Sequence, residues 1–254
     1  MRMPAEPFEP AVRDPRKLRR TGLILTVFMI VSAVGVYLAY MKLAERQAAD
    51  ETPSFKGRIE KNFKLWKQDG SEGNLAEMEG EVYVIAPVLF SEPDRWKHTR
   101  GVLERLSKRY AGRDDFHIVC LTIDPEGEPP EKLAEYAKEL GAELPQWWLG
   151  ATREESVHKF LKNILKMETI PHRKDGEWIY DGTLVVVDRD RHIRKGTVRT
   201  DKRARMDAPF DFEAAAKWDL EQPTPGDPHR VSRDLEGLLI QVIDHVLAKP
   251  VAKS

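Results

Sequence analysis

The sequence has a single cysteine, Cys120, among its 254 residues. An internal disulfide needs two cysteines, and so does a Cys-x-x-Cys redox pair or a metal site built from several thiolates. All three kinds of site are therefore excluded. Cys120 lies in an apolar stretch, and free cysteine is among the most buried residue types, so we expect a core thiol rather than a reactive one.

The chain also lacks an excess of either charge. Its 41 basic residues stand against 42 acidic ones, which gives a formal net charge of −1. This balance offers no electrostatic reason for nucleic acid to bind, and we expect no nucleic-acid partner. With 41% hydrophobic and 33% charged residues, the chain has the composition of a globular protein with one sizeable core.

Motifs of several enzyme classes are missing as well. The sequence contains no G-x-S-x-G elbow, no Gly-rich phosphate loop and no H-E-x-x-H. Peroxide reduction would need a cysteine in a loop, whereas Cys120 falls inside an expected strand. We therefore predict that the chain is not an enzyme.

One long apolar run is present near the N-terminus. Residues 22–41, GLILTVFMIVSAVGVYLAYM, carry no charge, and a helix of this length spans a hydrocarbon core of roughly 30 Å. We expect a single transmembrane helix in contact with the lipid bilayer. A cleaved signal peptide is the alternative, but its apolar region is usually about 7–15 residues long and no small-x-small site follows closely here. Acids and prolines in the first ten residues disfavour a mitochondrial transit peptide.

The charges that flank this run predict its orientation. One acid, Asp14, and five basic residues lie close before it, whereas charges of both signs follow it; the basic residues are Arg13, Arg16, Lys17, Arg19 and Arg20. The positive-inside tendency keeps residues 1–21 in the cytoplasm and exports the rest. We expect a bacterial inner-membrane protein with a polar tether at 42–57 and a periplasmic domain at 58–250.

The exported part alternates between strand and helix patterns. Residues 81–90 and 116–124 are apolar runs typical of strands buried on both faces. Helical spacing predicts helices over residues 94–110, 130–140, 152–166 and 232–248. Residues 182–200 are typical of two strands joined by a turn at 189–191. This order predicts an α/β domain with a central mixed β-sheet flanked by helices.

Three finer predictions accompany this pattern. Thr152 and Glu155 have the spacing of a capping box at the start of the third helix. His158 points away from the apolar stripe of that helix, so we expect it to be solvated. Residues 201–230 are polar and contain the breaker run PTPGDP, which predicts a surface insertion with a short helix at 212–220.

Three segments in one order carry a resemblance to a known family. They are FKLWKQDGSEGNLAEMEGEVYVI (63–85), LTIDPEGEPPEKLAEYAKELG (121–141) and PQWWLG (145–150). Together they resemble the Sco/SenC family, and Asp124-Pro125 with its following helix is the most specific part. The resemblance, over about residues 63–200, implies a thioredoxin-like fold. It also implies the function of that family, whose members carry copper to the dinuclear centre of cytochrome c oxidase or reduce the cysteines of that centre.

The ligand positions of the family are altered in this sequence. The family holds copper with a Cys-Pro-Asp-x-Cys loop and an Asp-His-Thr step, which fall on EPDRW (92–96) and DGT (181–183). Glu92, Trp96 and Gly182 therefore stand at the three ligand positions. Copper(I) prefers sulfur ligands and a thiol relay needs thiols, so we expect neither activity and no cofactor.

Two functions remain open. The first is a non-catalytic binding or assembly factor related to cytochrome c oxidase biogenesis, with another membrane or periplasmic assembly protein as partner. Its interaction loop would comprise Glu92, Pro93, Asp94, Trp96 and Asp181, with acids in the first helical turn and Trp96 packed where metal would lie.

The second function is a metal carrier that uses substitute ligands. Glu92, Asp94 and His98, with His172 or His192 from distant loops, would form a carboxylate and imidazole set of the kind that zinc or copper(II) accepts. We favour the first function, because the fixed close spacing of metal ligands is absent from the sequence.

Overall fold

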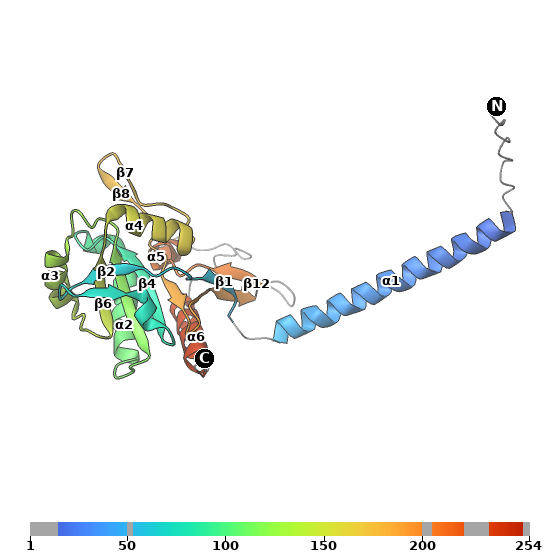
Figure 1. The fold of residues 1–254 in the computed structure, drawn as a ribbon, viewed down its shortest axis with the longest axis horizontal. Coiled ribbons are helices and arrows are strands. Elements are labelled where there is room, and N and C mark those ends of the chain that lie inside the picture. The colour runs from blue at the N-terminus through green and yellow to red at the C-terminus, as the bar shows by residue number, and fades with distance from the viewer. Residues whose placement is uncertain (1–14, 50–52, 200–204, 221–233, 251–254) are drawn as a thin grey trace, which may run out of the picture. The chain divides into compact units, whose positions relative to one another are not determined.

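A computed structural model describes residues 15–49, 53–199, 205–220 and 234–250 (Figure 1). The chain divides into two compact units, Met1–Glu51 and Thr52–Ser254. The described part of the first unit is one helix, α1 (Pro15–Ala49). Its segment Pro15–Lys42 contains an 18-residue window with a mean hydropathy of 2.3 and is long and apolar enough to cross a membrane. The expected span at 22–41 thus lies within one continuous helix.

The second unit is built on an eight-stranded sheet in the order β1-β10-β9-β4-β5-β6-β2-β3. β4 is parallel to β5 and β5 to β6, whereas β9 is antiparallel to β4. This confirms the predicted mixed sheet. The strands are β1 (Phe55–Arg58), β2 (Lys64–Lys67), β3 (Glu72–Asn74), β4 (Val82–Val88), β5 (Phe116–Thr122), β6 (Trp147–Ala151), β9 (Val185–Val187) and β10 (His192–Arg194).

Two further hairpins lie outside this sheet. β7 (His172–Lys174) pairs with β8 (Glu177–Ile179), and β11 (Gly196–Arg199) pairs with β12 (Arg205–Ala208). The β7–β8 hairpin projects from the domain next to α4 (Figure 1). Its turn, Asp175-Gly176, has positive φ at both residues, which is the geometry that a tight two-residue hairpin turn requires.

The two central strands divide the core into two layers. Every residue of β4 and β5 is buried, as their continuous apolar runs predicted. Successive side chains of β4 alternate between the layers, because Val84 and Ala86 pack on one face and Tyr83 and Ile85 on the other.

Helices cover both faces. One layer contains buried side chains from α2 (Lys97–Arg109), α3 (Pro130–Leu140), α5 (Phe212–Leu220) and α6 (Leu235–Leu247). The other contains side chains from η1 (Leu75–Met78), α4 (Glu154–Lys159) and the π-helical turn η3 (Phe160–Ile164). The predicted helices are confirmed, although the first begins as a 3-10 turn, η2 (Pro93–Trp96). Gly141 ends α3 in the left-handed conformation, with φ 64°.

Cys120 is fully buried at the centre of β5, which confirms the expected core thiol. The Nε1–H of Trp147 donates to its Sγ at 3.3 Å. Burial raises the pKa of the thiol to about 12, so it stays protonated and unreactive at neutral pH.

Two predictions for α4 are wrong. The helix begins at Glu154 with Arg153 at the N-cap and without a side-chain cap, so Thr152 and Glu155 form no capping box. His158 is half-buried rather than solvated: its Nε2 lies 2.9 Å from the Ile123 carbonyl oxygen, and its ring meets Trp178 edge-on. The reason is tertiary, because the β7–β8 hairpin brings Trp178 over this side of the helix.

The stretch 201–230 also differs in part from a surface insertion. Phe210, Phe212 and Ala215 are buried, and they pack in the same layer as α2 and α6. The predicted short helix is present as α5. Residues 201–204 and 221–230 lie outside the described part of the chain, as does Ser232 at the expected start of the last helix.

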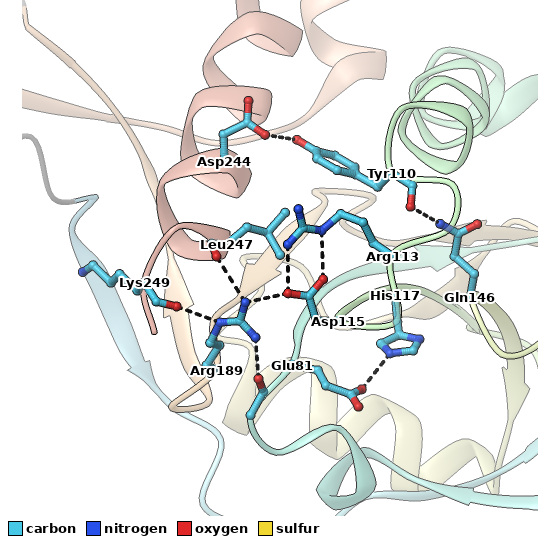
Figure 2. Close-up of polar contacts among 11 residues, drawn as sticks. Glu81, Tyr110, Arg113, Asp115, His117, Gln146, Arg189, Asp244, Leu247 and Lys249 are labelled. Atoms are coloured by element: carbon cyan, nitrogen blue, oxygen red, sulfur yellow. Dashed lines mark hydrogen bonds and ion pairs between the residues drawn. The ribbon is translucent and has the colours of Figure 1, made fainter. Parts of the chain in front are cut away.

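A polar network joins the sheet to the C-terminal helix at the end where β4 and β5 begin (Figure 2). Arg189, in the turn between β9 and β10, donates to Asp115 at 2.6 Å and to the Gly80 carbonyl at 2.7 Å. The same guanidinium donates to the carbonyl oxygens of Leu247 and Lys249, at 3.1 and 3.0 Å. It therefore satisfies backbone acceptors at the end of α6 that the helix itself leaves unpaired.

Candidate functional site

A buried carboxylate fixes the position of the loop after β4. Glu128, 1% exposed, accepts a hydrogen bond from the Ser91 backbone N–H at 2.6 Å and one from the Thr122 hydroxyl. A buried acid is stable only when it is bonded in this way. Glu128 therefore sets the position at which the chain leaves the sheet and enters Glu92–Trp96.

Trp96 fills the inner side of this loop. Its side chain is 3% exposed and meets the Phe90 ring edge-on, with 5.8 Å between ring centroids. Among the described residues, its indole Nε1 has no hydrogen-bond partner. The indole is thus part of the core layer and offers no lone pair to a metal.

Arg95 joins the loop to the β7–β8 hairpin. Its Nη1 donates to Glu92 at 3.0 Å, and its Nη2 donates to the Trp178 carbonyl oxygen. The guanidinium carbon also lies 5.4 Å from the centre of the Tyr180 ring, within the range of a cation–π contact. Glu92 therefore forms an ion pair inside the loop. Tyr180, which follows β8, contacts the same arginine, so this segment lies next to the loop.

Glu213 provides the cap that the sequence does not reveal. This residue of α5 accepts hydrogen bonds from the backbone N–H groups of His98 and Thr99, at 2.8 and 3.0 Å. Those groups belong to the first turn of α2, where the helix dipole favours a negative charge. The sequence predicted Glu92 and Asp94 as the acids of this turn, but Glu213 is more than a hundred residues away, so no local signal indicates it.

Gly182, in the segment Asp181–Thr183, lines a cavity of about 590 Å³ that the loop also lines. Asp94, Trp96 and Gly182 all line this cavity, together with His98 and Glu213. The Asp181 carboxylate accepts from the backbone N–H groups of Glu168 and Thr183, at 2.8 and 2.9 Å, which fixes the turn before Gly182. Two distant segments that the sequence singled out are therefore neighbours here.

Asp124 fixes the position of the β7–β8 hairpin. It is 8% exposed, and its Oδ2 accepts from Trp178 Nε1 at 3.0 Å and from Arg173 at 2.9 Å. Its Oδ1 accepts from the Gly127 N–H, and a Cβ at Gly127 would lie only 2.6 Å from this carboxylate. The Asp124 side chain thus connects the end of β5 to the β7–β8 hairpin through hydrogen bonds.

The substitute metal ligands are not gathered in the described part of the chain. The group of three carboxylate or imidazole ligands found there is Asp188, Asp190 and His192, on the turn between β9 and β10. Asp188 already accepts from Arg194 and from two backbone N–H groups, so its charge is neutralised. His172 lies on β7, where its Nδ1 is 2.9 Å from the Ile170 carbonyl oxygen.

A family model described as SCO1/SenC matches residues 51–204, more than half of the chain. The chain belongs to the SCO1/SenC family. No curated protein sequence matches it.

Among solved structures, this SCO1/SenC chain is similar to a SCO1/SenC family lipoprotein from Bacillus anthracis str. Ames. The two share 15% identity and a TM-score of 0.52, over 74% of this chain and 99% of that one. It is also similar to BsSco, a member of the Sco family of cytochrome c oxidase assembly proteins; the two share 15% identity and a TM-score of 0.49, over 74% of this chain and 98% of that one. Bradyrhizobium japonicum ScoI with copper bound matches with 16% identity and a TM-score of 0.46, over 71% and 99%.

The family and the fold predicted from the sequence are thereby confirmed: the domain is a Sco-type, thioredoxin-like fold. Copper does not fit the side chains at the predicted ligand positions. Glu92 is paired with Arg95, Trp96 is packed in the core, and Gly182 has no side chain. With one buried cysteine in the whole sequence, the chain has no cysteine pair for thiol–disulfide exchange.

Proposed function

We propose that this SCO1/SenC protein is a membrane-anchored, non-catalytic binding protein that assists assembly of a membrane complex, without carrying copper. The observation that carries the proposal is the Arg95 bridge. Arg95 links the loop at 92–96 to Trp178 and Tyr180, which lie just before Asp181–Thr183, and the resemblance assigns the metal ligands to that loop and to that step. The site is thus held together by the protein's own groups, and its surface is available for a partner without a metal.

The partner class follows from the family and the anchor. Membership of the SCO1/SenC family points to assembly of cytochrome c oxidase, and the proposed partner is accordingly an oxidase subunit or another assembly factor of that complex. Helix α1 would place the domain at the bacterial inner membrane, with the basic N-terminus in the cytoplasm and the domain in the periplasm. There the domain has direct access to exported parts of membrane proteins.

Site-specific photo-crosslinking in the native membrane tests this function. Asp94 and Asp114 are both exposed, but they lie at opposite ends of the parallel strands, after β4 and before β5. Each is replaced in turn by a benzophenone amino acid in the full chain. We expect the Asp94 variant to form one dominant adduct with an oxidase subunit or assembly factor, identified by mass spectrometry. Adducts that are the same from both positions, or absent from Asp94, would refute the proposed function.

A further inference from the structure

Two cavities join beside Gly182 and form one groove. The second cavity, of about 530 Å³, lies between β9, β10 and the segment before α5. It shares four lining residues with the first, namely Tyr180, Gly182, Asp211 and Ala214. The groove therefore continues from the η2–α2 loop past the segment 180–183 towards β10.

The backbone beside this groove is unpaired. Within the described ranges, the N–H groups of Asp181 and Gly182 and the carbonyl oxygen of Gly182 make no hydrogen bond. A Cβ added at Gly182 would meet only the Tyr180 ring, at 3.7 Å, so the peptide group is open to close approach. Backbone donors and acceptors that stay unpaired beside a cavity are suited to another extended chain.

The lining has a defined chemistry. Apolar side chains of Met167, Leu184 and Phe210 line the second cavity. Basic side chains line it too, but Arg194 and Lys195 are paired with Asp188 and Asp207, and Lys56 donates to the Lys166 carbonyl oxygen. Where the two cavities meet, Asp211 is the one charged residue that both share. Its Oδ1 accepts from the Ala214 N–H at 2.9 Å, and among the residues that the structure describes its Oδ2 makes no hydrogen bond. The junction therefore offers a single carboxylate next to the apolar side chains of the second cavity.

We propose that this groove binds an extended peptide segment of the partner protein. The segment pairs with the backbone of Asp181–Gly182 and inserts an apolar side chain towards Phe210. A Lys or Arg next to that side chain meets Asp211, which is the charge complement that the junction offers. This inference rests on the proposed function and names the form in which the partner is recognised.

A displayed library of random ten-residue peptides, selected on the full chain in lipid nanodiscs, tests the inference. We expect enriched peptides with an apolar residue beside Lys or Arg. Ala214→Trp fills the junction and should weaken their binding about tenfold or more, whereas Ala111→Trp adds the same ring on the exposed turn after α2 and should change nothing. Asp211→Asn keeps an N-cap side chain and should remove only the preference for Lys or Arg.

A second pair of variants tests the same groove without changing α5, in case Ala214→Trp disrupts the folding of that helix. Gly182→Leu should block the peptides, whereas Gly182→Ala adds only a Cβ that the space accepts. N-methylation of the peptides should abolish binding at alternate residues, as backbone pairing requires. The inference is overturned by the absence of enriched peptides, by equal binding to the Ala214→Trp and Ala111→Trp variants, or by indifference to N-methylation. If Asp94 still forms its adduct in that case, the proposed function stands and only the extended-peptide form is wrong.

Discussion

The two ends of the parallel strands β4 and β5 differ in how their polar groups are used. At the end where the strands begin, Arg189 binds a carboxylate and three backbone carbonyls, and a second arginine, Arg113, binds the same Asp115 at 2.8 Å (Figure 2). At the end where the strands finish, the groove is lined by Asp211 and Gly182, and within the described ranges the second Asp211 oxygen and the Gly182 backbone make no hydrogen bond. Polar groups at the first end are used for stability, whereas we propose that the second end, although held by its own contacts, also leaves polar groups for a partner.

The comparison shows how this chain differs from a metal-binding relative. A metal would fix the loop end through its ligands, but here an ion pair, a cation–π contact and a buried indole do so. These contacts leave the cavity beside them open. We therefore expect large stability losses at both ends, from Trp96 and from Arg189, but an effect on binding only at the end that contains the groove.

The largest effect is expected for Trp96→Ala. Removing a buried indole leaves a cavity in the core layer, which should lower the free energy of unfolding by about 3–5 kcal/mol. His98→Ala, two residues further on and exposed, should lower it by less than about 0.5 kcal/mol. Urea unfolding of the full chain in detergent measures both. Equal small losses would mean that Trp96 does not support the loop end.

Arg189→Ala should come second, with a loss of about 3 kcal/mol. The substitution leaves Asp115 and the last carbonyls of α6 without their shared donor. Arg113→Ala removes a more exposed partner of the same carboxylate and should cost less than about 1 kcal/mol. Peptide binding in the groove should be unchanged in both variants. Loss of binding in a folded Arg189 variant would show that the two ends are coupled.

Acid should lower the stability of the domain by protonating Asp115, which belongs to the Arg189 network. The hydrogen bond from Arg113, followed by that from Arg189, lowers the pKa of this carboxyl to about 2, against 3.8 for a free side chain. Because the folded-state pKa is depressed, the stabilisation is present above about pH 4 and is lost as the pH falls towards 2. We expect about 1 kcal/mol, since the side chain is 32% exposed and solvent screens its ion pairs.

A matched pair of titrations measures this contribution. The difference in unfolding free energy between the parent and Asp115→Asn should shrink between pH 4 and pH 2. A difference that stays constant over this range would contradict the assignment.

The smallest effect is expected from reductant. The buried Cys120 has no partner for a disulfide, so the melting temperature of the full chain should be the same with and without dithiothreitol. A shift of the monomer's melting temperature would show that the thiol is accessible.

The sequence predicted the elements whose signals are local. The apolar runs of β4 and β5 and the helix that ends at Gly141 follow from periodicity and from one glycine. Family resemblance, rather than periodicity, predicted that Trp96 and Gly182 would lie near each other, and both line one cavity.

Contacts between segments far apart in sequence could not be predicted. Glu213 caps α2 from α5, and Arg95 reaches the Trp178 carbonyl, although neither residue has a sequence feature that marks this role. His158 was mispredicted for the same reason, because helical periodicity carries no information about the hairpin that covers it.

Metal content tests the central claim most directly. The full chain, purified in detergent after growth with added copper and zinc, is compared with Glu92→Cys/Trp96→Cys/Gly182→His, which restores the ligand types that the resemblance implies. Gly182 has no positive φ, and an added Cβ there would meet only the Tyr180 ring at 3.7 Å, so the backbone accepts a side chain at this position. We predict no stoichiometric metal in the parent and a gain of copper(I) binding in the folded triple variant, measured by mass spectrometry and chelator competition. About one copper or zinc per parent chain, bound with its present side chains, would contradict the claim that this protein acts without a metal.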